Sequence, residues 1–192
     1  MKKRFKITLL IVLIFLVILI AYLKVIPIKL SLESKTLLTD FFELGENKTS
    51  VDVSDLVNDP KLAELYNLKF NSLLEFNKKE ENKNIDVNIN GIKRKNLNSY
   101  IVKFDVEREF NYKGLDNKSW AQDFYICEIQ KVNDKIYISK LIDGVDYNSY
   151  LDSKISNSVI RELIKYFLPF SEYSSYLNNE LESRKDFELN KK

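Results

Sequence analysis

The fold of this chain is decided by the stretch Tyr100-Ile101-Val102-Lys103-Phe104-Asp105-Val106-Glu107-Arg108-Glu109-Phe110. Successive side chains of a β-strand point to opposite faces of the sheet, so strict alternation marks a strand with two different faces. Here the even-numbered residues are apolar except for Arg108, and the odd-numbered residues after Ile101 are charged. The stretch therefore predicts a strand with one covered face and one largely solvated face.

Three further strands are predicted around this one. They cover residues 85–90, 119–131 and 136–141, and residues 132–135 form a short hairpin turn between the last two. The strand at 119–131 has large apolar residues on both faces. This pattern predicts a central strand that is covered on both sides, or covered by a partner.

Helical spacing of apolar residues precedes and follows the strands. Residues 31–44 form one predicted helix, which Gly45 ends, and residues 61–79 form a second, which Asp59 and Pro60 open. A solvated loop at 77–84 leads into the sheet, and the aspartates after the last strand, at 143, 146 and 152, indicate a polar turn. Predicted helices at 153–167 and 171–183 make the tail.

This order predicts an α+β fold in which helices pack on a curved four-stranded antiparallel sheet, followed by a C-terminal helical tail.

An uncharged apolar run from Ile7 to Leu23 follows a basic start. Extended to Ile26, a helix of this length matches a hydrocarbon core of ~30 Å. The basic start predicts a cytoplasmic N-terminus and an extracytoplasmic remainder. A cleaved signal peptide is the alternative, but bulky residues stand where a signal peptidase needs small ones. The predicted organisation is cytoplasmic residues 1–6, a transmembrane anchor at 7–26, a linker at 27–31, a domain at 32–152 and a helical tail at 153–192.

Composition excludes several functional classes. The chain has no histidine, which removes the commonest general base and most catalytic zinc sites. Its single cysteine, Cys127, sits mid-strand and is interpreted as a buried hydrophobe. Four scattered glycines exclude a glycine-rich phosphate loop, and the mixed charges give no basic stripe for nucleic acid. We therefore expect no metal, no cofactor, no nucleic-acid partner and no enzymatic activity.

Three segments carry a resemblance to a known superfamily. They are Leu65-Tyr66-Asn67-Leu68-Lys69-Phe70-Asn71-Ser72-Leu73-Leu74, Tyr100-Ile101-Val102-Lys103-Phe104 and Phe124-Tyr125-Ile126. Over about residues 32–145 the chain resembles the nuclear-transport-factor-2-like, cone-shaped α+β fold. It is especially similar to the N-terminal module that precedes cell-wall amidase domains in Gram-positive bacteria. Too few residues follow the sheet for an amidase domain, so the resemblance implies the accessory module without its enzyme.

Arg108 is the leading candidate for a ligand-binding residue, because it falls on the otherwise apolar face of its strand. If that face lines a concavity, the guanidinium could meet an anionic or carbonyl ligand, with Tyr100 and Trp120 as walls. The alternative is that Arg108 pairs with a structural carboxylate or reaches solvent.

Glu107 and Glu109 are the leading candidates for catalytic acids. They lie on one face of the strand, roughly 7 Å apart by strand rise, which is compatible with a glycosidase pair. A solvated sheet face explains the same row more simply.

Three functions follow from these observations. The favoured one is a membrane-anchored binding or scaffolding module of a bacterial cell-envelope, sporulation or conjugation assembly. Its partners would be the lipid bilayer and either other envelope proteins or a second copy of the chain. A peptidoglycan hydrolase using Glu107 and Glu109 is the alternative. A small-ligand sensor is the third, although about six cytoplasmic residues would leave little to receive a signal.

Overall fold

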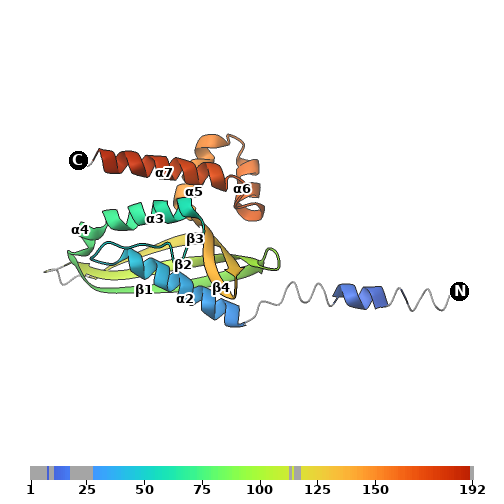
Figure 1. The fold of residues 1–192 in the computed structure, drawn as a ribbon. Helices are drawn as coiled ribbons and strands as arrows, with labels where there is room; N and C mark the ends of the chain where they lie inside the picture. Colours follow the sequence, from blue (N-terminus) through green and yellow to red (C-terminus); the bar gives the residue numbers. More distant parts are fainter. Residues whose placement is uncertain (1–7, 9–10, 18–27, 113, 115–117, 191–192) are drawn as a thin grey trace.

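The computed structural model (Figure 1) describes residues 8, 11–17, 28–112, 114 and 118–190. Its elements are α2 (Ile28–Gly45), α3 (Pro60–Ser72), α4 (Leu74–Asn77), β1 (Glu80–Arg94), β2 (Ser99–Tyr112), β3 (Lys118–Val132), β4 (Lys135–Asp143), α5 (Gly144–Lys154), α6 (Ser158–Phe167) and α7 (Tyr173–Leu189). The strands form one antiparallel sheet in the order β1-β2-β3-β4. The predicted α+β class with a four-stranded antiparallel sheet is thus confirmed.

The predicted membrane anchor at 7–26 falls largely outside the described residues. Within the described part of the chain, no helix is both long and apolar enough to cross a membrane. Residues 11–17, which are described, are helical, and their large apolar side chains are 50–68% exposed.

One face of the sheet carries the core. On β2 the residues Tyr100, Val102, Phe104 and Val106 are buried, as the alternation predicts. Helix α2 packs on this inner face, where the Phe42 ring lies 6.0 Å from Phe104 and 4.8 Å from Tyr125. Figure 1 shows α7 lying along α3, and the buried residues of α7 belong to the same apolar cluster as the sheet and the other helices.

The end of α2 makes a close approach to α3. A Cβ atom on Gly45 would lie 2.7 Å from the Phe70 ring, so only glycine fits there without moving that ring. This contact explains why the predicted stop at Gly45 is where α2 ends.

The predicted solvated loop at 77–84 is wrong. Asn77 is buried, and its amide Nδ2 donates to the carbonyl oxygens of Gly45 at 2.7 Å and Asn47 at 3.0 Å. These bonds satisfy carbonyl groups that the end of α2 leaves without intrahelical partners. The predicted helix at 61–79 divides at Leu73 into α3 and α4, and β1 begins at Glu80, where it pairs with Tyr112 of β2.

The polar turn predicted around residues 143–152 is a helix instead. The Asp143 carboxylate accepts hydrogen bonds from the backbone N–H groups of Val145 and Asp146, at 2.9 Å and 3.2 Å, which makes it the N-cap of α5. Aspartate followed by glycine is typical of both a turn and a helix start, so the sequence alone did not separate them.

Two local features complete the β3–β4 hairpin: a tight turn between the strands and a short pairing along the outer edge of β4. Asn133 and Asp134 have φ values of 48° and 63°, the left-handed pair that a two-residue hairpin turn requires. Beyond β4, residues 56–58 add a short parallel pairing, because Ile138 donates to the Leu56 carbonyl at 2.9 Å and accepts from Asn58 N–H at 3.1 Å. The segment that leads into α3 thereby covers the outer edge of β4.

Candidate functional site

Arg108 lies on the inner face of β2, where its charge is matched by carboxylates of the same chain. Its guanidinium pairs with Asp123 of β3, and its Nη1 lies 3.7 Å from Glu46 Oε1 at the end of α2. Burial alone would lower the pKa of Arg108, but the charges of Asp123 and Glu46 raise it overall. This geometry corresponds to the alternative interpretation, a structural ion pair, and the guanidinium stays charged.

Tyr100 and Trp120 do not lie beside Arg108. Tyr100 stands opposite Ile129 at the other end of β2, where its buried ring contacts the Arg94 guanidinium at 5.6 Å. Trp120 stands opposite Glu109, one position away from the Arg108–Ala121 pair, so its indole points from the other face of the sheet. The three predicted ligand-binding residues therefore share no site, and the expectation of aromatic walls around Arg108 is wrong.

A small cavity of about 130 Å³ adjoins the Arg108 guanidinium between α2, α3 and β3. Its aromatic wall consists of Phe42, Tyr66, Phe70 and Tyr125. Lys69, at its rim, lies 3.4 Å from an Asp146 carboxylate oxygen and 3.5 Å from one of Glu180. Burial raises the pKa values of Tyr66 and Tyr125. The cavity has paired charges and protonated phenols, and its volume is enough for a few waters rather than a substrate.

The carboxyl group of Asp143, which also lines this cavity, should make the free energy of unfolding depend on pH. Burial raises the pKa of its carboxyl above the ordinary 3.8, against the opposing effect of the α5 N–H groups and Lys69. The native state then holds more protons than the unfolded state just above that value, so this group makes stability fall as pH rises. Asp143→Asn keeps an oxygen for the cap and cannot ionise. We expect urea denaturation between about pH 4 and pH 7 to show a smaller loss of stability for this variant than for the wild type.

Asp52 supplies a control of opposite sign for this measurement. Hydrogen bonds from Ser54 and Asn67 lower the pKa of its exposed carboxyl, so its contribution is present above the ordinary pKa and lost as pH falls. Asp52→Asn should therefore lower the free energy of unfolding at neutral pH. If the free energy of unfolding changed with pH in the same way for Asp143→Asn and the wild type, a raised pKa of Asp143 would be contradicted.

The candidate acids Glu107 and Glu109 lie on the outer face of the sheet. Glu107 stands opposite Asp86 and Gln122, and Glu109 stands opposite Asn84 and Trp120. The Glu109 carboxylate lies 3.7 Å from Lys118 Nζ. Neither glutamate lines any of the cavities and grooves described here, and both lie on the outer face of the sheet.

The outer face of β2 and β3 also carries exposed aromatic groups. Trp120 is 60% exposed and Phe124 is 39% exposed. Phe124 lines a groove of about 430 Å³ between this face and helices α5 and α6. The other apolar lining residues are Ile126, Ile142, Tyr147 and Pro169. Lys103 also lines the groove and has no ionic or hydrogen-bond partner among the residues that the structure describes. This is a surface on which another molecule could be held.

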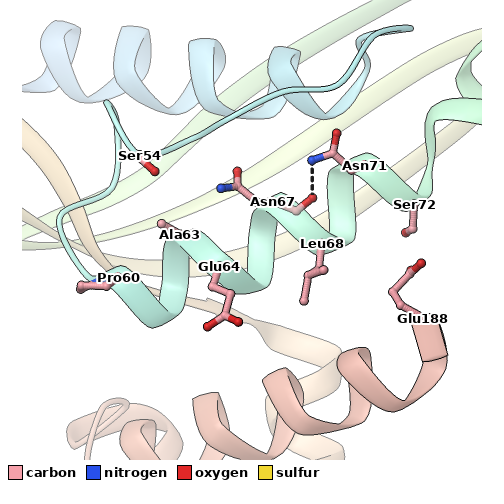
Figure 2. A pocket seen from close by; sticks show the side chains of 9 residues that line it. All are labelled: Ser54, Pro60, Ala63, Glu64, Asn67, Leu68, Asn71, Ser72 and Glu188. Atoms are coloured by element: carbon pink, nitrogen blue, oxygen red, sulfur yellow. Dashed lines mark hydrogen bonds between the residues drawn. The ribbon is translucent and has the colours of Figure 1, made fainter.

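A second groove, of about 510 Å³, lies between α3 and α7 (Figure 2). Its amide groups are already engaged. Asn67 accepts from Val53 N–H at 2.8 Å, and Asn71 accepts from Val51 N–H at 3.0 Å while donating to the Asn67 carbonyl at 2.7 Å. These amides hold the segment before α3 in place, so the groove offers a ligand few free polar groups.

Helix α6 was predicted, but its orientation was not. Ile164 packs against the core, but the other apolar side chains point to solvent: those of Val159, Ile160, Leu163 and Phe167, followed by Leu168. The basic groups point the other way: Arg161 donates to the Ile155 carbonyl at 2.7 Å and pairs with Asp152 at 3.0 Å. The helix thus presents its apolar side outward.

Cys127 is a free, fully buried thiol, and burial raises its pKa well above the ordinary value. It is therefore unreactive at neutral pH. In the described ranges, no three histidine, cysteine or acidic side chains are grouped in a way that could hold a metal ion.

Comparison with known proteins gives no relative. No family model matches the chain, and no curated protein and no solved structure matches it. The resemblance to the nuclear-transport-factor-2-like superfamily therefore stays an expectation from the sequence.

Proposed function

We propose that this chain is a single-pass membrane protein whose extracytoplasmic domain binds a partner protein of the bacterial cell envelope. Cell-envelope assembly, sporulation and conjugation are the candidate settings. The anchor at residues 7–26 is supported by the apolar sequence and by the exposed helical residues 11–17.

The observation that carries the binding role is the exposed part of the outer face around Trp120 and Phe124, beside the groove under α5 and α6. Exposed apolar groups that form a patch mark interaction sites, and tryptophan is among the residues that most often dominate binding energy. Glu107 and Glu109 beside Trp120 would favour a partner with basic side chains around an apolar contact. The adjoining groove beside Phe124 could accept one side chain of that partner.

The test is crosslinking in intact cells of the source organism, followed by affinity capture and mass spectrometry of the full chain and two variants. Trp120→Ala removes the proposed contact. Phe187→Ala removes an aromatic ring of similar exposure from α7, away from the outer face, and serves as control. We expect a defined set of envelope proteins with the wild type and the control, and recovery at least about tenfold lower with Trp120→Ala.

Equal recovery with Trp120→Ala would contradict a partner site on the outer face. Recovery of the chain alone, with no envelope protein, would contradict the binding role itself.

A further inference from the structure

The end of the sheet nearest the predicted anchor combines basic and apolar groups in an unusual way. The β1–β2 hairpin reads Lys93-Arg94-Lys95-Asn96-Leu97-Asn98, and Leu97 at its tip is 71% exposed. The neighbouring β3–β4 hairpin exposes Val132 between Lys131 and Lys135. Lys131 N–H donates to the Asn98 carbonyl at 2.7 Å, so the two hairpins lie together.

Helix α2 starts at the same end. Lys29 in its first turn acts electrostatically on Asp134, and Glu33 acts on Lys131, both residues of the β3–β4 hairpin. The anchor predicted at residues 7–26 would join the domain at Ile28, the first residue of α2. If the anchor crosses a bilayer, this end of the sheet is held against the bilayer surface.

The C-terminal end of α6 reaches toward this end as well. Phe170, three residues after α6, contacts Lys140 Nζ at 5.4 Å, and Lys140 lies 3.5 Å from Glu128. Glu128 in turn accepts hydrogen bonds of 2.9 Å from Lys95 of the β1–β2 hairpin. Figure 1 shows α6 and the start of α2 at the same end of the domain.

We propose that this end of the domain docks on the lipid bilayer, with Leu97 and the apolar side of α6 entering the interface. This inference rests on the proposed function, which supplies the anchor. Helices that lie on a bilayer present an apolar side to it, and α6 has such a side, while its basic groups Arg161 and Lys165 pair with Asp152 and Glu162. Of the hairpin lysines, Lys95 pairs with Glu128 and Lys131 with Asp134, so exposed Lys93 would be the main contact with anionic headgroups.

The size of the exposed patch favours lipid over a second copy of the chain. The exposed parts of the apolar α6 side chains amount to roughly 400 Å², at about 100 Å² for a fully exposed aliphatic group and about 200 Å² for phenylalanine. A stable protein interface buries about 800 Å² on each partner. An interfacial helix has no such threshold when an anchor already holds it at the bilayer, because the tether makes the second contact intramolecular.

The test uses the chain's single tryptophan, Trp120, as an internal reference. Trp120 lies far along β3 from the hairpin at residues 132–135. The full chain is reconstituted in phosphatidylcholine and phosphatidylglycerol vesicles with brominated acyl chains, which quench tryptophan only within the bilayer. Two variants, Leu97→Trp and Phe167→Trp, are made in a Trp120→Phe background. Both sites are exposed, so the fold should be retained, and circular dichroism checks this.

We expect about twofold or greater quenching for both variants and none for the wild type, since interfacial groups sit at the depth of the upper acyl chains. Vesicle flotation after alkaline washing is measured in parallel. If the chain floats and neither variant is quenched, the docking inference is overturned while the anchor stands. A chain that does not float overturns the anchor and the docking together. Emission that shifts to the blue without quenching, and grows with protein density, overturns lipid docking in favour of contact between copies.

Discussion

Phe41→Ala is expected to lower the free energy of unfolding by about 3–5 kcal/mol, the usual cost of emptying a phenylalanine site in a core. Phe41 is fully buried on α2, and its ring centroid lies 5.2 Å from Phe42, 5.0 Å from Tyr66 and 5.3 Å from Phe70. Loss of the ring removes apolar burial and three aromatic contacts together, and the close approach of α2 and α3 at Gly45 limits how far the site can collapse. Such a loss is a large part of the ~5–15 kcal/mol that stabilises a typical domain.

The measurement is chemical denaturation of the full chain in mild detergent, followed by near-ultraviolet circular dichroism. Phe167→Ala is the matched control, since it makes the same chemical change on the exposed side of α6, where Phe167 is 76% exposed. Its effect should stay within about 0.5 kcal/mol. Similar losses for the two variants would show that Phe41 does not sit at the centre of the core.

Deletion of residues 1–27 is expected to move the protein from the membrane fraction to the soluble fraction. A transmembrane helix is effectively irreversible as an anchor, whereas an interfacial patch alone gives weak, reversible binding. Alkaline washing of membranes should therefore leave the full chain in place and extract the deletion variant completely. A full chain that washes off, or a deletion variant that resists washing, would contradict an anchor at residues 7–26.

A milder variant tests the same anchor without shortening the chain. Leu13→Arg places a charge within the apolar run, at a cost of about 2.5–3.5 kcal/mol for insertion at a helix centre. It should lower the inserted fraction, and Leu13→Ala should leave that fraction nearly unchanged.

The strands were predictable because each carries its own pattern. The alternation at 100–110 gave the inner and outer faces of β2 correctly, since the pattern and the sheet share a period of two. The hairpin turn at 132–135 was likewise predicted from its residues. Asn77 could not have been predicted as buried, because the carbonyl groups that it satisfies belong to residues 45 and 47, on a different helix end.

The candidate site depended on information that a single strand lacks. Whether Trp120 joins Arg108 depends on the register between β2 and β3, and a shift of one residue would have placed it on the inner face. The spacing of apolar residues predicted a helix over 153–167, and the structure has α6 at Ser158–Phe167, after a break at residues 155–157. The spacing did not show whether the apolar side packs on the domain or faces solvent. Periodicity shows only which residues share one side of a helix, not what that side contacts.

The pairing of residues 56–58 with β4 has a consequence for how the protein behaves when it is concentrated. An open sheet normally offers two edges at which copies can add strands and grow into fibrils. Here residues 56–58 block the edge of β4 at Ile138, and the other edge strand, β1, has its pairing with β2 interrupted by shifts at Glu81/Asn84 and Ile89/Gly91. Strand-by-strand growth would thus meet a blocked position on one side and an irregular template on the other. Concentrated protein should consequently be slow to form fibrils.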